Sequence, residues 1–315
     1  RMAELKIFAG NANPEFAKKV AFHAGVELGH AKFSRFADGE AQIEIHESVR
    51  GCNVFVIQPA CPPVNESYME LFMILDALRR ASANEISAVL PYYGYARQDR
   101  KVAPRAPISA KTVADLMKTA GADRIIAVDL HSSQIQGFFD GPVDHLFAIP
   151  TFAREWREKM GFGEEFVAVS PDAGGVERCR AFAKRLGCSI AIIDKRRAGP
   201  NQVESVRLVG DVAGKTAIIL DDMIDTAGTL TQAVDSLLKN DAKRVFAVAT
   251  HPVLSGPAIS RLKESGVEKV WVSDSIPLSA AAQASGKFEV ISVAPVVAEA
   301  IKRINTYDSV SALFD

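Results

Sequence analysis

The stretch Ile218-Ile219-Leu220-Asp221-Asp222-Met223-Ile224-Asp225-Thr226-Ala227-Gly228-Thr229 passes from an apolar run through two carboxylates into a loop of small and hydroxyl-bearing residues. A helical pattern begins near Leu230. A strand that ends in such a loop before a helix gathers several backbone N–H groups around one point, where the helix dipole favours a phosphate. The carboxylates of Asp221 and Asp222 can accept sugar hydroxyls or hold a divalent cation through water. These features predict a phosphorylated sugar as the ligand of this loop.

Short runs rich in β-branched residues recur along the chain, and helical periods follow them. Strands are expected at residues 54–57, 86–90, 125–128, 166–169, 189–193, 217–220, 245–248 and 270–272. Helical spacing of apolar residues is found at 68–83, 109–120 and 229–240. The strands are continuously apolar, so both faces of the sheet are expected to be covered by helices. This pattern is typical of the α/β class with parallel strands.

A weak internal repeat indicates two domains. Residues 50–58 resemble residues 213–221, and each copy is followed by a loop, a helix and a strand that runs into proline. Duplication of one α/β unit is favoured, with chance similarity between two βαβ units as the alternative. The first copy has residues 59–67 in place of the acidic loop, so the two halves are expected to bind different ligands. The boundary is expected near residues 147–150, after a stretch rich in Gly, Asp and Pro.

The composition is that of an ordinary globular protein, with 48% hydrophobic and 24% charged residues. A net charge of −1 gives no general attraction to nucleic acid or to an anionic membrane, so neither is expected as a partner. The four cysteines lack CxxC spacing, which favours reduced thiols. No apolar run approaches about 18 residues and no signal-peptide pattern is present, so we expect a cytoplasmic protein.

Residues 194–203 carry three cations beside Gly199-Pro200-Asn201, a strong turn signal. The flanking strands predict a hairpin or flap. A solvated basic turn is the usual interpretation of such a run, so the residues alone leave its role open.

Several longer motifs identify a family. DLHSSQIQGFFDGPVD at 129–144 resembles the signature of the ribose-phosphate diphosphokinases, the phosphoribosyl pyrophosphate synthetases. RFADGE at 35–40, PYYGYARQD at 91–99, SPDAGG at 170–175 and DKRR at 194–197 are similar to the family as well. The resemblance runs from residues 8–11 to residues 309–314, and it is to the phosphate-activated, ADP-inhibited hexameric class.

The resemblance implies two type I phosphoribosyltransferase-like domains with mainly parallel sheets flanked by helices. The N-terminal domain is expected at 2–147 and the C-terminal domain at 148–300, with a segment at 301–315 packing back on the first. The implied reaction transfers the β,γ-diphosphoryl group of ATP to the anomeric hydroxyl of ribose 5-phosphate. Its products are 5-phosphoribosyl 1-diphosphate, for nucleotide biosynthesis, and AMP.

The resemblance also implies roles for single residues on the acidic loop and the flap. Lys195 and Arg197 would stabilise the transition state when the flap closes. The ribose 5-phosphate site would comprise Arg197, Asp221, Asp222, Asp225, Thr226, Ala227, Gly228 and Thr229. Helix capping alone explains one of these residues and not the two adjacent acids. Many members have glycine where Ala227 stands, and the methyl group is expected to be tolerated unless this residue needs a positive φ.

Mg²⁺ is the implied cofactor, with His131 and Asp172 as its ligands. Mg²⁺ prefers oxygen, so His131 follows from the resemblance only. Asp172 is favoured by its own position, because it follows the strand 166–169 and the carboxyl edge of an open α/β sheet is where ligands bind.

The implied ATP site consists of Phe36, Asp38, Gly39, Glu40, Arg97 and Gln98. An aromatic ring and a guanidinium can sandwich adenine while carboxylates accept from its amine, although Phe36 alone would be read as a core residue. In the family the loop at 36–40 reaches a neighbouring subunit, so a homo-oligomer is expected, a hexamer built from dimers. Arg50, Ser82, Ser309 and Ser311 are candidates for an allosteric phosphate and ADP site, although terminal serines are usually only solvated.

Three other functions would share some of these features. A phosphoribosyltransferase would share the acidic loop but not the signature at 129–144 or a second α/β half. An inactive regulatory subunit of the same family should have lost the flap cations, which are present here. A repressor would need a basic DNA-binding domain, and the charge balance offers none.

Overall fold

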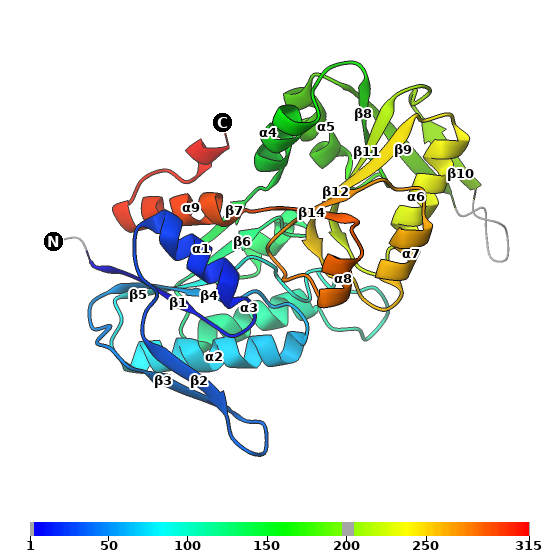
Figure 1. Cartoon of the computed structure of the whole chain (residues 1–315). Coiled ribbons are helices and arrows are strands. Elements are labelled where there is room, and N and C mark those ends of the chain that lie inside the picture. Colours follow the sequence, from blue (N-terminus) through cyan, green and yellow to red (C-terminus); the bar gives the residue numbers. More distant parts are fainter. Residues whose placement is uncertain (1–2, 197–204, 315) are drawn as a thin grey trace. The chain divides into compact units, whose positions relative to one another are not determined.

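The computed structural model describes residues 3–196 and 205–314. The described chain forms two compact units (Figure 1). The first comprises the residues up to Phe147 together with those from Ser292 onward, and the second is Ala148–Ile291. The return to the first unit thus precedes the expected limit at residue 300. That limit would cut helix α9 (Ala294–Thr306), whose apolar face packs as one piece on the first unit.

The first unit contains a parallel sheet with the order β1-β4-β5-β6-β7. These strands are β1 (Leu5–Ala9), β4 (Asn53–Ile57), β5 (Glu85–Leu90), β6 (Arg124–Val128) and β7 (Val143–Leu146). Helices α2 (Val64–Arg80) and α3 (Ser109–Ala120) cover one face and bury Leu71, Leu75 and Met117 against it. Helix α1 (Pro14–Ala24) pairs with α9 on the other face (Figure 1). Two short 3₁₀ turns, Ser133–Gly137 and Ser311–Leu313, complete this unit.

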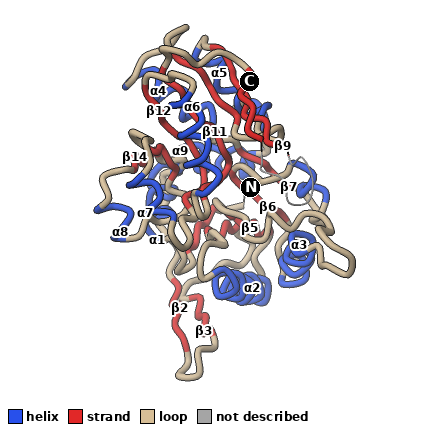
Figure 2. The backbone as a smooth tube through the Cα atoms, turned by 90° about the vertical axis from the view of Figure 1, so that its right-hand side faces the viewer, coloured by secondary structure: helices blue, strands red, loops and turns tan. Residues whose placement is uncertain are grey.

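A separate antiparallel hairpin, β2 (Ala31–Arg35) and β3 (Ala41–Ile45), packs along α2. Its tip carries residues 36–40 and projects away from the rest of the unit (Figure 2). The sequence patterns predicted neither strand, because β2 and β3 have short, half-buried runs without the continuous apolar character of the central strands.

The second unit contains a sheet with the order β10-β9-β8-β11-β12-β13-β14, in which only β10 is antiparallel among the described strands. These strands are β8 (Phe166–Ser170), β9 (Ser189–Arg196), β10 (Ser205–Val209), β11 (Thr216–Ile224), β12 (Arg244–Pro252), β13 (Val270–Ser273) and β14 (Phe288–Ile291). Its helices are α4 (Ile149–Lys159), α5 (Val176–Leu186), α6 (Gly228–Lys239), α7 (Ala258–Glu264) and α8 (Ala280–Ala284). The α/β class with mainly parallel sheets is therefore confirmed, as are all eight expected strands and the three expected helices.

The two units repeat one topology, which supports the duplication inferred from the sequence. The order β1-β4-β5-β6-β7 of the first unit matches β8-β11-β12-β13-β14 of the second. Each unit also inserts an antiparallel hairpin at the same point of the chain, β2–β3 in one and β9–β10 in the other. In each unit, the helix that follows the last strand in the sequence belongs to the other unit. Helix α4 follows β7 but packs on α5 of the second unit, and α9 follows β14 but packs on α1 of the first.

The faces of the second sheet are filled differently. Leu230, Val234 and Leu237 of α6 and Leu262 of α7 pack on one face. On the other face Trp156 is fully buried, with its ring 4.8 Å from that of Trp271 and 5.2 Å from that of Phe246. These aromatic contacts anchor α4 to β12 and β13 of the sheet.

Candidate functional site

The loop after β11 is shorter than the sequence pattern suggested. β11 continues through both acids to Ile224, with Asp221 paired to Ala249 of β12, so only residues 225–227 separate the strand from α6. Asp221 and Asp222 are thus held by a sheet rather than by a loop. Rigid placement of this kind suits groups that must meet a substrate in a fixed geometry.

Ala227 adopts a left-handed backbone conformation with φ of 63°. Its methyl group was expected to be tolerated unless this residue needs a positive φ, and the φ is positive. It is the N-cap of α6, whose first turn has no side-chain cap. In the described chain, the amides of residues 226–230 have no hydrogen-bond acceptor. Five N–H groups at a helix N-terminus that lack a partner form an anion site of the kind that binds phosphate.

The two acids are neighbours on β11, and the pKa of Asp221 is raised. Asp222 is 5% exposed, and its amide donates to Asp221 Oδ1 at 2.8 Å. Burial raises the pKa of Asp221 well above its usual range, and the hydrogen bond with Asp222 and that residue's negative charge act in the same direction. Arg178, on α5, lowers the same pKa. The pair therefore holds a proton more readily than exposed aspartates do, until a cation or a hydroxyl donor reaches it.

Asp172 lies at the carboxyl end of β8, as expected. It is exposed, and its Oδ1 accepts from the Gly175 amide at 2.9 Å. Ser170 Oγ donates to the Asp172 carbonyl at 2.6 Å, which fixes the turn. An exposed carboxylate oxygen on a rigid turn fits a hydrated Mg²⁺, which keeps several waters.

His131 follows β6 in the first unit and is also exposed. It stands in the signature segment, which begins with Asp129 at φ of 40° and bends back to β7 through a hydrogen bond from the Leu130 amide to His145 Nε2. His131 and Asp172 belong to different units. The structure does not bring these two expected ligands together within one unit. In the described residues no cluster of three His, Cys, Asp or Glu side chains is suited to a metal ion.

The expected flap is a hairpin at its base. β9 and β10 pair antiparallel, with Lys195 opposite Val206. Lys195 is therefore the next-to-last residue of β9, a strand of the second sheet. Arg197, with the tip at 197–204, lies outside the described residues.

The expected ATP residues of the first unit fall into two groups. Phe36 is 51% exposed at the tip of the β2–β3 hairpin, where the amides of Phe36 and Gly39 donate to the carbonyls of Glu40 and Phe36. Asp38 Oδ1 accepts from the Glu40 amide at 3.1 Å. The core interpretation of Phe36 is wrong, because a five-residue tip on a two-stranded hairpin has no second layer to bury a ring.

Arg97 and Gln98 form the second group, after β5. Gln98 holds the start of α3, since its carbonyl accepts from the Ala110 amide and its Oε1 accepts from Ser109 Oγ at 2.6 Å. Arg97 is exposed. In the described part of the chain no hydrogen bond joins these residues to the hairpin tip.

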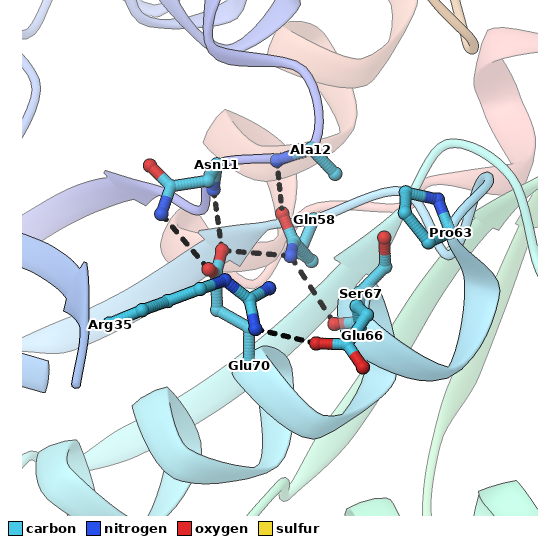
Figure 3. A pocket seen from close by; sticks show the side chains of 8 residues that line it. All are labelled: Asn11, Ala12, Arg35, Gln58, Pro63, Glu66, Ser67 and Glu70. Atoms are coloured by element: carbon cyan, nitrogen blue, oxygen red, sulfur yellow. Dashed lines mark hydrogen bonds and ion pairs between the residues drawn. The ribbon is translucent and has the colours of Figure 1, made fainter. Parts of the chain in front are cut away.

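Sequence reasoning missed the residues that hold the hairpin in place. Arg35 Nη1 donates to Glu66 Oε2 of α2 at 2.5 Å and to the Gly39 carbonyl at 3.0 Å. It closes one side of a cavity of about 140 Å³. Figure 3 shows Arg35 reaching across this cavity toward Glu66. Arg35 is the first residue of the motif at 35–40, but nothing in its spacing marks it as a support of the loop.

The floor of the same cavity is a buried polar network (Figure 3). Gln58, 1% exposed, accepts from the Ala12 amide and donates to Glu70 Oε1 at 3.0 Å. Glu70 also accepts from the amide and the side chain of Asn11. In the internal repeat, Gln58 of the first unit corresponds to Asp221 of the second. The first unit therefore has a side-chain amide at the position where the second has a carboxylate.

The expected allosteric residues form two local pairs in the first unit. Arg50 precedes Gly51, whose amide donates to the Ser82 carbonyl at 3.0 Å. Ser309 Oγ and Ser311 Oγ are 3.0 Å apart, and Arg303 donates to the Ser309 carbonyl. All four are exposed, and in the described chain no hydrogen bond joins one pair to the other.

Comparison with known proteins decides the family. The profile described as the N-terminal domain of ribose phosphate pyrophosphokinase matches residues 5–121, and that of the phosphoribosyl synthetase-associated domain matches residues 196–315. The ribose-phosphate pyrophosphokinase of Oceanobacillus iheyensis is 52% identical, over 99% of this chain and 98% of that protein. That of Bacillus subtilis is 53% identical, over 98% and 97%.

The chain belongs to the ribose-phosphate pyrophosphokinase family. A crystal structure of phosphoribosylpyrophosphate synthetase from Mycobacterium smegmatis has a TM-score of 0.90 and 46% identity, covering 96% of this chain and 99% of that one. That structure shares the fold described above across almost the whole chain. No helix of the described chain is long and apolar enough to cross a membrane.

Proposed function

We propose that this chain is a ribose-phosphate pyrophosphokinase, which transfers the β,γ-diphosphoryl group of ATP to the anomeric hydroxyl of ribose 5-phosphate. The observation that carries the proposal is the site after β11, where five amides without acceptors stand at the N-terminus of α6 beside two sheet-held acids. Near-complete coverage by relatives of that name supports it.

The residues of the second unit supply the sugar-phosphate half of the reaction. The amides of residues 226–230 bind the 5-phosphate, and Asp221 and Asp222 accept the ribose hydroxyls. The anomeric oxygen then attacks the β-phosphorus and loses its proton. The bond from that phosphorus to the bridging oxygen of the α-phosphate breaks, and AMP leaves. The protein's task is to position the two substrates and to neutralise charge.

Lys195 is proposed to neutralise charge on the transferring group, together with Arg197. Its place as the next-to-last residue of β9, on a strand paired with β10, supports this role, because the sheet fixes its backbone position. Lysine and arginine aimed at a transferring phosphoryl group stabilise the transition state more than the ground state.

Mg²⁺ is proposed as the cofactor, held by Asp172 and His131 with water completing its coordination. When bound, the metal would neutralise the charge of the β- and γ-phosphates of ATP. The exposed carboxylate of Asp172 on a hydrogen-bonded turn supports the proposal.

ATP is proposed to bind through Phe36, Asp38, Gly39 and Glu40 of one subunit and Arg97 and Gln98 of another. The projecting, half-exposed tip supports a site completed between subunits, and hence a hexamer built from dimers. Phosphate and ADP would act at Arg50, Ser82, Ser309 and Ser311. The free cysteines of the described chain, Cys52, Cys61, Cys179 and Cys188, support a cytoplasmic location.

The deciding experiment incubates the protein with ribose 5-phosphate, ATP and Mg²⁺ and identifies the nucleotide product. AMP formed in equal amount with 5-phosphoribosyl 1-diphosphate is expected, and only when ribose 5-phosphate is present. ADP as the product would indicate transfer of a single phosphoryl group and would overturn the proposed reaction. Titration with inorganic phosphate and ADP tests regulation separately, and a flat response to both would contradict it.

A further inference from the structure

We infer that Arg261 of α7 is a positioning residue for the phosphate loop, an inference that rests on the proposed function of that loop. Arg261 Nη1 donates to the Thr226 carbonyl at 3.1 Å. A Cβ atom added at Gly228 would lie 3.2 Å from the same nitrogen. The guanidinium therefore lies against the back of the loop at Thr226 and again at Gly228.

Every carbonyl from Ile224 to Gly228 accepts a hydrogen bond. Those of Ile224 and Asp225 accept from the amides of Leu254 and Ser255, both at 2.9 Å. At the other end of the loop the donor is Thr231, whose Oγ1 donates to the carbonyls of Ala227 and Gly228 at 2.9 and 3.1 Å. The Thr226 carbonyl stands between these two groups, and Arg261 is its donor.

The direction of the carbonyls sets the direction of the amides. In a trans peptide the C=O and the following N–H share one plane and point in opposite directions. A donor that holds the Thr226 carbonyl at the back of the loop therefore turns the Ala227 N–H toward the front, where the phosphate binds. Because Ala227 is in the left-handed region, this peptide is the one that needs outside support.

Arg261 differs in kind from the other donors. In the described chain it is the only side chain from outside the loop and α6 that donates to these carbonyls. It also brings a full positive charge beside the N-terminus of α6, which adds to the attraction for an anion. Removal of its charged hydrogen bond is expected to weaken ribose 5-phosphate binding about tenfold.

The test compares Arg261→Met, Arg261→Lys and, as the matched control, Lys263→Met, which removes an exposed cation from the same helix. Dissociation constants for ribose 5-phosphate and for ATP are measured by calorimetry, with KM and kcat for both substrates. Arg261→Met should raise the ribose 5-phosphate dissociation constant about tenfold and leave that of ATP unchanged. Arg261→Lys should recover much of the loss, and Lys263→Met should have no effect.

Gly228→Ala gives a second, independent readout. Its added methyl presses on the guanidinium, so it should weaken ribose 5-phosphate binding in the wild-type background and much less beside Arg261→Met.

Unchanged ribose 5-phosphate affinity in Arg261→Met would overturn the inference, as would an equal loss of ATP affinity or an equal loss in Lys263→Met. Simple additivity of Gly228→Ala and Arg261→Met would overturn it too. Failure of the wild-type protein to bind ribose 5-phosphate at all would instead refute the proposed function.

Discussion

Ala227 shows how one backbone angle governs the loop. Its φ of 63° suits glycine and costs an alanine about 1 kcal/mol or more. The sequence showed that residue 227 is alanine where many family members have glycine, and that this matters only if φ is positive. It could not supply the value of φ, because that angle is set by the carbonyl partners of neighbouring residues.

Replacement of Ala227 tests this strain. Ala227→Gly is expected to raise the free energy of unfolding by up to about 1 kcal/mol, since glycine relieves the angle but gains freedom in the unfolded chain. Ala227→Val should lower it, because a β-branched residue fits this region poorly. Chemical denaturation of the three proteins measures both changes. Equal stabilities would show that residue 227 is not strained.

Asp221 gives a pH dependence whose sign follows from its raised pKa. A carboxyl whose pKa is higher in the folded state contributes stability at low pH, and that contribution is lost as pH rises from about 4 through the raised value. Asp221→Asn should therefore stabilise the protein at neutral pH, and its advantage should shrink toward pH 4. Thermal melts across this range measure it, with Asp235→Asn on the exposed side of α6 as the control. A difference that does not vary with pH would contradict the assignment.

Lys195 is the residue whose removal should separate chemistry from binding. Lys195→Ala is expected to lower kcat by about 10² to 10³ while the dissociation constant of ribose 5-phosphate changes little, because its charge is proposed to act on the transferring group. Steady-state rates and calorimetry provide the two numbers. Lys243→Ala, an exposed lysine at the amino end of β12, is the control. Near-normal turnover in Lys195→Ala would refute the assignment.

At the scale of elements, the central strands and main helices followed from the sequence because their burial leaves continuous apolar runs. The β2–β3 hairpin did not, since one layer of two strands buries too little to impose such a pattern. Its expected part in ATP binding came from the motif alone, whereas its support by Arg35 and Glu66 came only from the structure.

The turn after β1 offers a test of the buried network in the first unit. A Cβ at Gly10 would lie 2.2 Å from Gln58 Oε1, and Gln58 cannot swing away without breaking its hydrogen bonds to Ala12, Ser67 and Glu70. Gly10→Ala should lower the free energy of unfolding by about 1–3 kcal/mol. Gly137→Ala is the control, because a Cβ there meets nothing within 4 Å. Equal denaturation midpoints for the two variants would contradict this account.

For the whole molecule, the repeat could be inferred from two short segments, but the exchange of α4 and α9 could not. Both helices have ordinary amphipathic patterns, and such a pattern shows which face is buried without showing which surface covers it. The expected limit at residue 300 differs from the end of the second compact unit at Ile291 for this reason.

Ile301 tests the dependence of the first unit on α9. It is fully buried, and Ile301→Ala should cost about 2–5 kcal/mol. Hydrogen exchange should quicken in α1 and β1 while the strands of the second unit keep their protection. Lys302→Ala, which removes only a surface pair with Glu299, should change little. Equal loss of protection in both units would show that α9 does not belong to the first alone.

The exchanged helix also bears on how the protein is made. Synthesis proceeds from the N-terminus, and domains generally begin to fold in that order. Here the first unit must wait for α9, which the ribosome produces after the entire second unit. Until then α1 lacks the helix on which it packs, so the unit whose synthesis starts first is completed last.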